Sequence, residues 1–204
     1  MSSYKSFAVI GAGALGSTIV VAFAAQNLPV VVLARPGSKS TDKLPAGTKL
    51  ATVDTSDAAA VAAVFKEHTV DVGIWAEKNQ IAKQLKSAGI PSLRIYNGLF
   101  TEYIPWLFVN AETKNIHIVG KDEAPLSAMA LPDVAGFVVH VLTTPPSAEL
   151  ENKIFRIEGG RTKVNDLGAL FKTAVEYVTK IPGEMGDIKT IVATELDFGL
   201  GSTG

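Results

Sequence analysis

A glycine-rich stretch near the beginning of the chain has the residue types and the spacing needed to hold a phosphate group. Gly11, Gly13 and Gly16 in "GAGALG" match the pattern G-x-G-x-x-G directly after an apolar run. The first glycine permits a tight turn, the second lets the backbone approach a pyrophosphate, and the third lets a helix pack closely. A helix beginning with Ala14 and Leu15 offers free N–H groups and a positive dipole end to the anion. The pattern predicts a dinucleotide-binding turn; the alternative is a purely structural strand–helix turn.

The end of the next apolar run indicates which dinucleotide is preferred. Arg35 in "LARPGSKS" stands where an NAD site usually has Asp or Glu for the ribose hydroxyls. Its guanidinium suits a phosphate dianion, and Ser38 and Lys39 follow it. These residues favour NADPH over NADH. The alternative is that Lys39 and Lys43 are only solvated loop charges.

A group for acid–base chemistry is harder to find. No tyrosine has a lysine four residues further on, and the three histidines have no partner at ligand spacing. Lys78 shares a predicted helix face with Ile81 and Leu85, at the end nearest the carboxyl ends of the strands. A half-buried lysine there can exchange protons near neutral pH. The alternative is that Lys78 extends to water along its apolar stem.

The elements that must position these residues alternate between strand and helix. Ranges of apolar and amphipathic residues predict strands at 6–10, 29–34, 48–54, 69–75 and 90–97, with helices at 14–26, 55–68 and 76–89. Ser56 is a plausible N-cap of the second helix. The order predicts an α/β fold, a Rossmann-type doubly wound parallel sheet.

The second half of the chain has a looser pattern. Residues 98–108 are aromatic and loop-like, 116–120 and 152–160 predict strands, and 132–144 predict a helix. Residues 163–180 predict one helix, capped by Asn165 or Asp166. We expect a dinucleotide-binding core over 1–97 and a small substrate-binding lobe over 98–204, within one compact unit.

Composition narrows the class of protein. Hydrophobic residues make up 47% of the 204 residues, the net charge is -1, and cysteine is absent. No basic cluster indicates a nucleic-acid surface, and no run predicts a membrane span. The run 7–26 also resembles the apolar part of a signal peptide, but its ordered glycines and the strand after it favour the dinucleotide interpretation and a cytoplasmic or nuclear location.

Four stretches together resemble the NmrA-like and isoflavone reductase-like family of atypical short-chain dehydrogenases. They are "FAVIGAGALG", "VVVLARPGS", "EKNQIAKQLKSAGIPSLRIYNGLFTEYI" and "NKIFRIEGGRTKVNDLGALF", and the resemblance runs from about Ser6 to Gly201. It implies a Rossmann fold, NADPH, and Lys78 as the proton donor. It also implies that Asn97, Gly98 and Phe100 line the nicotinamide and substrate pocket.

The chain departs from the family pattern after its fourth strand. "VDVGIW" runs directly into "AEKNQ", so several tens of residues that the family has there are absent, and the C-terminus is also short. Three interpretations follow. The protein is an NADPH-dependent reductase of a small aromatic or conjugated carbonyl-like substrate, a non-catalytic NADP(H) sensor that alters a regulatory protein partner, or a folded relic that binds little cofactor.

Overall fold

The computed structural model describes residues 4–75 and 93–203, which form two compact units. The first unit, called here the N-terminal unit, takes its residues from 1–94 and 131–154. The second, called here the C-terminal unit, takes its residues from 95–130 and 155–204.

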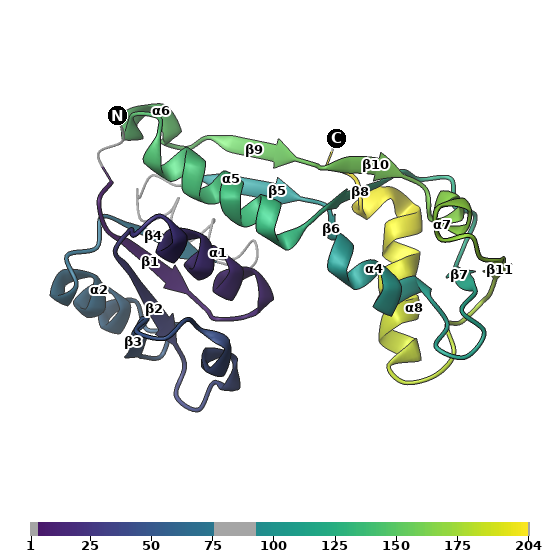
Figure 1. The fold of residues 1–204 in the computed structure, drawn as a ribbon, viewed down its shortest axis with the longest axis horizontal. Helices are drawn as coiled ribbons and strands as arrows, with labels where there is room; N and C mark the ends of the chain where they lie inside the picture. Colours follow the sequence, from purple (N-terminus) through teal and green to yellow (C-terminus); the bar gives the residue numbers. More distant parts are fainter. Residues whose placement is uncertain (1–3, 76–92, 204) are drawn as a thin grey trace. The chain divides into compact units, whose positions relative to one another are not determined.

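The N-terminal unit is built on a four-stranded parallel sheet with strand order β3-β2-β1-β4 (Figure 1). Its elements in chain order are β1 (Phe7–Ile10), α1 (Ala14–Ala25), β2 (Val30–Ala34), the 3-10 helix η1 (Lys39–Lys43), β3 (Lys49–Thr52), α2 (Ala58–Glu67), β4 (Val72–Trp75), α5 (Leu131–Thr143) and α6 (Ser147–Leu150). After β3 the chain returns to the other side of β1, so the strand order reverses between β1 and β4. Ligands of open α/β sheets bind outside the carboxyl ends of the strands at such a reversal.

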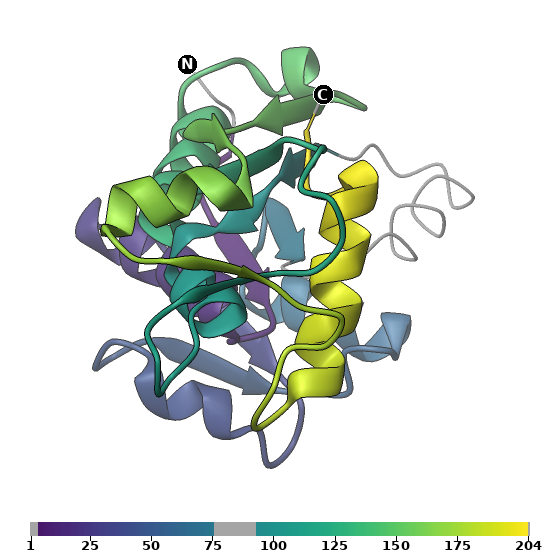
Figure 2. The same cartoon turned by 90° about the vertical axis from the view of Figure 1, so that its right-hand side faces the viewer.

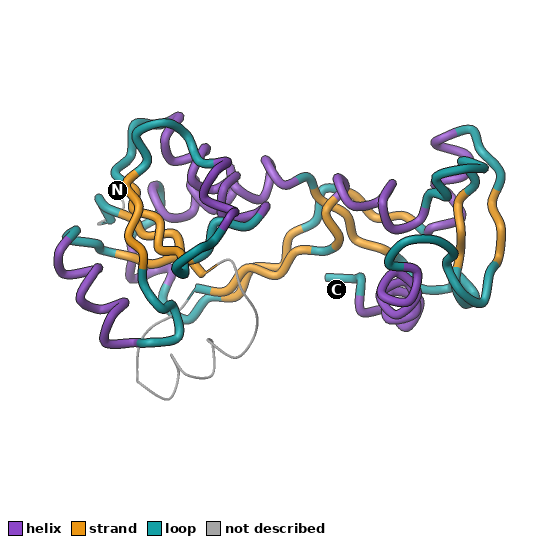
Figure 3. Tube along the Cα trace, turned by 90° about the horizontal axis from the view of Figure 1, so that it is seen from below, coloured by secondary structure: helices purple, strands orange, loops and turns teal. Residues whose placement is uncertain are grey.

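Both faces of this sheet are covered, which explains why β1 is apolar at every position. Ala8 and Ile10 pack with Val61 of α2 on one face. On the other face the Phe7 ring stacks on Phe23 of α1, with ring centroids 4.4 Å apart. Burial on both faces removes the alternation of polar and apolar residues that a half-exposed strand shows. Figure 3 shows the strands in orange and the surrounding helices in purple.

The helix α5 belongs with the N-terminal unit because it packs along α1. Its buried side, which includes Val134, Val138 and Leu142, is spaced by three and four residues. This arrangement differs from the expected division into 1–97 and 98–204, since residues 131–154 return to the first unit. A helix packed on both sides also accounts for the almost wholly apolar sequence of α1.

The C-terminal unit contains two small sheets that contribute to one apolar core and a third, β5-β9, whose first residues Arg94 and Ile154 are counted with the N-terminal unit. Its elements are β5 (Arg94–Asn97), β6 (Leu99–Phe100), the 3-10 helix η2 (Thr101–Tyr103), α4 (Ile104–Phe108), β7 (Ile116–Ile118), β8 (Leu126–Met129), β9 (Ile154–Ile157), β10 (Gly160–Thr162), α7 (Val164–Phe171), β11 (Val175–Tyr177), α8 (Gly186–Glu195) and the π-helical stretch η3 (Leu196–Leu200). The sheets are β10-β8-β6, β11-β7 and β5-β9. Figure 2 shows α8 in yellow, which contributes Ala193 to the core formed around Leu107, Phe108 and Ile116.

The cap of α2 differs from the predicted one. Asp57, not Ser56, is the N-cap, and its carboxylate accepts hydrogen bonds from the N–H groups of Ala59 and Ala60 at 2.9 and 3.1 Å. The Ser56 hydroxyl instead donates to the Asp54 carboxylate at 2.7 Å, in the turn that precedes the helix. Adjacent residues of similar capping ability compete, and the local turn decides between them.

The single helix predicted over 163–180 is wrong. The helix α7 ends at Phe171, because Lys172 adopts the left-handed conformation with φ 55° and ψ 45°. Val175–Tyr177 then pairs with β7 as a parallel strand. Neither predicted residue is the N-cap, which is Lys163, but the Asp166 carboxylate does take part in capping by accepting a hydrogen bond from the Lys163 N–H at 3.2 Å. Asp122, 42 residues before Val164, also accepts hydrogen bonds from the N–H groups of Val164 and Asn165, at 2.9 and 2.8 Å.

Other parts of the second half contain more structure than the sequence pattern indicates. The stretch 98–108, expected to be loop-like, holds β6, η2 and α4. The helix α8 had no predicted counterpart. The strand predicted over 90–97 is present as Arg94–Asn97, and its partner in the described residues is β9.

Candidate functional site

The glycine turn follows β1 and is tied to the carboxyl end of β2. The N–H of Gly11 donates to the carbonyl of Leu33 at 2.9 Å. Gly11 has φ +94°, a conformation that strongly favours glycine. The turn therefore places the start of α1 at the edge of the sheet where the parallel strands end.

The N-terminus of α1 is open to an anion. Gly13 is its N-cap, without a side-chain cap, and the first turn contains no acidic residue. The first backbone hydrogen bond of the helix runs from the N–H of Ser17 to the carbonyl oxygen of Gly13, at 2.9 Å. The N–H groups of Ala14 and Leu15 precede that bond and so have no intrahelical acceptor. Gly13 and Ala14 are both exposed.

Two glycines of the motif serve opposite steric needs. A Cβ atom on Gly16 would lie 2.0 Å from the carbonyl oxygen of Gly11, so the helix can approach the turn only with glycine at this position. A Cβ atom on Gly13 would meet nothing within 4 Å. The open space beside Gly13 adjoins the uncapped helix end, and uncapped helix N-termini are a kind of site that binds anions.

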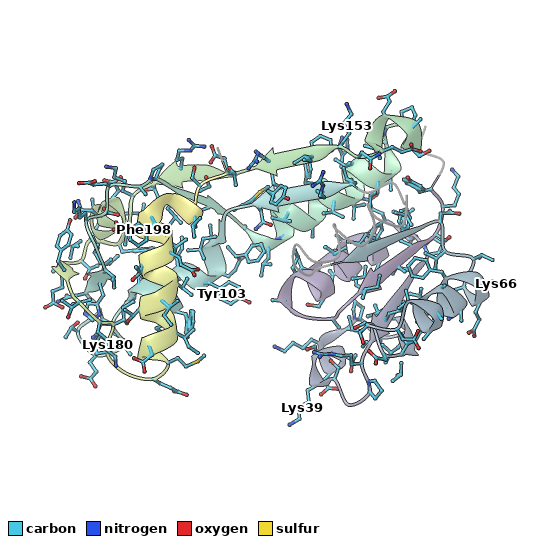
Figure 4. The ribbon with its side chains drawn as sticks, turned by 180° about the vertical axis from the view of Figure 1, so that it is seen from behind. Lys39, Lys66, Tyr103, Lys153, Lys180 and Phe198 are labelled. Atoms are coloured by element: carbon cyan, nitrogen blue, oxygen red, sulfur yellow. The ribbon has the colours of Figure 1, made fainter. Side chains whose placement is uncertain are left out.

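Cationic and hydroxyl side chains follow β2. Arg35 is exposed, and its carbonyl accepts a turn hydrogen bond from the N–H of Ser38 at 3.2 Å. Ser38 precedes η1, and Lys39, which Figure 4 labels, is exposed at the start of that helix. Because Leu33 is bonded to Gly11, the Arg35 loop and the glycine turn belong to the same edge of the sheet.

Asp54 is a member of this edge that the sequence reasoning missed. The Ser56 hydroxyl, donating to Asp54 at 2.7 Å, holds the pKa of this carboxyl below its ordinary value. The Ser56 backbone N–H and the positive charge of Arg35 lower that pKa further. Arg35 is thus within electrostatic reach of a carboxylate from the neighbouring strand end. An aspartate directly after the third strand, with serine two residues on, is the signal that could have identified it.

Asn97, Gly98 and Phe100 lie in the C-terminal unit as one continuous segment. The side-chain amide of Asn97 donates to the carbonyl of Gly98 at 2.8 Å. A Cβ atom on Gly98 would lie 2.0 Å from the carbonyl oxygen of Ser127, so this backbone is in direct contact with β8. Lys78 lies outside the described residues.

The histidines have structural surroundings. His117 is buried on β7, with its Nε2 atom 3.1 Å from the Glu176 carboxylate of β11, while His140 is exposed near the end of α5. Within residues 4–75 and 93–203, no group of three or more potential ligand side chains has a metal-binding arrangement. No helix in these ranges is both long and apolar enough to span a bilayer.

Comparison with known proteins agrees with the fold. Residues 8–88 match the sequence model of the NAD dependent epimerase/dehydratase family. No curated protein matches the sequence. These 81 matched positions, counted from 8 to 88, begin inside β1 and include every described element from α1 to β4.

Solved structures with similar folds include reductases. The binary complex of leucoanthocyanidin reductase with NADPH from Vitis vinifera has a TM-score of 0.71 at 15% identity, covering 94% of this chain and 85% of that one. The structure titled "AtPrR2 with NADP+ and (+)pinoresinol" has a TM-score of 0.67 at 17% identity, covering 87% of this chain and 79% of that one. An isoflavone reductase has a TM-score of 0.66 at 15% identity, covering 86% of this chain and 79% of that one.

The fold is therefore α/β with a parallel sheet of the Rossmann type, as predicted. The family match and the likeness to an isoflavone reductase agree with the broader part of the resemblance found in the sequence. The assignment to the NmrA-like branch stays a prediction, as do the individual site residues.

Proposed function

We propose that the protein is an NADP(H)-binding oxidoreductase that reduces a small aromatic or conjugated carbonyl-like substrate. The observation that carries the proposal is the uncapped N-terminus of α1, beside the open space at Gly13, on the same sheet edge as Arg35. A helix end of this kind binds a pyrophosphate, and an exposed guanidinium at the end of β2 suits a 2′-phosphate. The structural likeness to NADPH-dependent reductases supports the same cofactor class.

The residues of the N-terminal unit have separate roles in this proposal. The N–H groups of Ala14 and Leu15 bind the pyrophosphate, while Gly13 leaves room for it and Gly16 keeps the helix against the turn. Arg35, Ser38 and Lys39 bind the 2′-phosphate. Arg35 can present two parallel N–H donors to a phosphate, which a lysine cannot do.

The charge balance at this edge bears on specificity. Asp54 keeps its charge because Ser56 and Arg35 lower its pKa. Its carboxylate attracts the guanidinium of Arg35 electrostatically, so the residues after β2 and β3 both contribute to the charge at this edge.

The reduction itself needs surroundings for the nicotinamide and a proton donor. When bound, NADPH supplies the hydride. In this proposal Asn97, Gly98 and Phe100 form the surroundings of the nicotinamide, and Lys78 donates a proton to the substrate oxygen from its Nζ atom. The assignments of these four residues rest on the resemblance of the sequence to the isoflavone reductase-like family.

The proposal is tested first by binding and then by turnover. Titration with NADPH and NADH, followed by nucleotide fluorescence, should give a dissociation constant for NADPH at least about tenfold lower than that for NADH. No binding of either nucleotide overturns the proposal. NADPH oxidation is then followed with a panel of quinones, enones and aldehydes, for the wild type and for Lys78→Ala. Binding without any turnover would favour the sensor interpretation over the reductase.

A further inference from the structure

The short segment Gly201–Thr203 is built into the sheet of the C-terminal unit by buried polar contacts. The carbonyl of Gly201 accepts a hydrogen bond from the N–H of Ser127 at 2.9 Å. The N–H of Thr203 donates to the Ser127 hydroxyl oxygen at 3.1 Å. Ser127 is fully buried and Thr203 is 7% exposed. Buried polar groups that are this well satisfied hold a backbone in one position.

A carboxylate completes the cluster. Glu158, directly after β9, accepts a hydrogen bond from the Ser127 hydroxyl and a longer one, at 3.4 Å, from the Thr203 hydroxyl. Arg161 donates to the same carboxylate through Nε and Nη2 at 3.1 Å. The hydroxyl of Ser127, followed by Arg161, lowers the pKa of Glu158, which therefore stays charged near neutral pH.

The cluster adjoins the segment to which the proposed function assigns the nicotinamide. Ser127 is in contact with Gly98 through its backbone, since a Cβ atom on Gly98 would lie 2.0 Å from the Ser127 carbonyl oxygen. Immediately beyond this contact, Leu99 and Phe100 pair with β8. Any shift of β8 at Ser127 therefore moves Gly98 directly.

A second connection reaches the same segment from β9. The carbonyl of Thr203 accepts a hydrogen bond from Nη1 of Arg156 at 3.3 Å. The guanidinium of Arg156 lies over the Tyr96 ring, 5.3 Å from its centroid. Tyr96 immediately precedes Asn97, so Thr203 is connected to both sides of the junction between β5 and β6.

We infer that Thr203 is a positioning residue for the Asn97–Phe100 segment. It acts through Ser127 and Glu158 on one side of that segment and through Arg156 and Tyr96 on the other. This inference rests on the proposed function, because it is the nicotinamide half of the bound dinucleotide that the segment would contact. Thr203 itself need not touch the ligand.

The test compares two probes that differ in the nicotinamide half. NADPH engages the whole site, whereas 2′,5′-ADP engages only the adenine half. Thr203→Val removes the hydroxyl that contacts Glu158 and Ser127 but keeps the backbone hydrogen bonds to Ser127 and Arg156, so it tests the hydroxyl contacts alone. In this variant the dissociation constant for NADPH should rise about three- to tenfold. The value for 2′,5′-ADP should stay unchanged. Thr203→Ser restores the hydroxyl and should restore wild-type NADPH binding.

Thr194→Val is the matched control. Among the residues that the structure describes, the hydroxyl of Thr194 donates only to the Thr190 carbonyl within α8, at 2.8 Å, so its loss should affect neither probe. Amide hydrogen exchange of the ligand-free protein gives a second readout: exchange at Asn97–Phe100 should be faster in Thr203→Val than in the control. Glu158→Gln, which keeps the size of the side chain, should give the same pattern if Thr203→Val folds poorly.

The outcomes separate the two proposals. If the wild type binds NADPH and both probes respond equally to Thr203→Val, or neither responds, the positioning role is wrong while the proposed function stands. If the wild type binds neither probe, the proposed function is wrong and this inference falls with it. If Thr203→Val weakens the binding of NADPH but not of 2′,5′-ADP, and Thr203→Ser restores it, the result supports both the proposed function and the positioning role.

Discussion

Gly16 and Gly11 are in such close contact that a Cβ atom on Gly16 would lie 2.0 Å from the Gly11 carbonyl oxygen. The contact joins the first turn of α1 to the turn after β1. It leaves the N-terminus of the helix directed at the space beside Gly13, where a Cβ atom would meet nothing within 4 Å. The two glycines can therefore be separated by experiment.

Gly16→Ala should destabilise the protein, because the added methyl group must displace backbone. Overpacking of this kind costs about 1–3 kcal/mol in the free energy of unfolding, measured by urea denaturation. Gly13→Ala should change that free energy by less than about 1 kcal/mol, since its conformation, φ -65° and ψ -173°, is open to alanine. It should nevertheless weaken NADPH binding by filling the space for the pyrophosphate. Wild-type affinity in Gly13→Ala would contradict the proposed position of the pyrophosphate.

Arg35→Gln should weaken NADPH binding about 10- to 100-fold and leave NADH binding unchanged, because only NADPH carries the 2′-phosphate. Lys66→Gln is the control, since Lys66 is an exposed cation on α2, away from Lys39 in the same unit (Figure 4). Fluorescence titration of both nucleotides gives the comparison. An equal loss of affinity for NADPH and NADH in Arg35→Gln would contradict the role assigned to Arg35.

Asp122→Ala should destabilise the C-terminal unit by about 1–3 kcal/mol. The buried carboxylate of Asp122 takes part in capping α7, and its loss leaves the N–H groups of Val164 and Asn165 without an acceptor. Asp187→Ala removes an exposed carboxylate paired with Lys180 and should cost less than about 1 kcal/mol. Urea denaturation of both variants tests the difference, and equal costs would show that Asp122 does not act as a cap.

Ser56→Ala should weaken the dependence of stability on acid pH. The pKa of Asp54 is lowered from its ordinary 3.8, so its contribution to stability is complete above that pH and is lost as the pH falls through the lowered pKa. Removing the Ser56 hydroxyl takes away the main cause of the shift. Unfolding measured from pH 7 to pH 2 should give a shallower acid slope for Ser56→Ala than for wild type. Ser17→Ala, whose hydroxyl bonds only to the Ala14 carbonyl, should keep the wild-type slope.

The sequence predicted the N-terminal unit well because its information is local. The strands and helices from β1 to β4 were confirmed within a few residues, since buried parallel strands appear as short apolar runs and the glycine turn has a distinctive spacing. The cap of α2 was missed by one residue because the choice between Ser56 and Asp57 depends on the turn at Asp54.

The C-terminal unit was predicted less well because its structure depends on distant contacts. The cap of α7 comes partly from Asp122, and β11 exists because Val175–Tyr177 finds β7 about sixty residues earlier. The return of residues 131–154 to the N-terminal unit is equally invisible in local patterns. For the same reason the role inferred for Thr203 follows from contacts and not from any motif.

The packing of α5 on α1 has a consequence for the synthesis of this protein. The N-terminal unit takes residues from both 1–94 and 131–154, so its last piece leaves the ribosome long after its sheet has been made. Until then the side of α1 that α5 covers has no permanent partner. The nascent chain therefore has to keep the apolar helix α1 soluble while residues 95–130 of the C-terminal unit are translated. We expect chaperone dependence to be greatest in that interval, and to end once Ile154 has emerged.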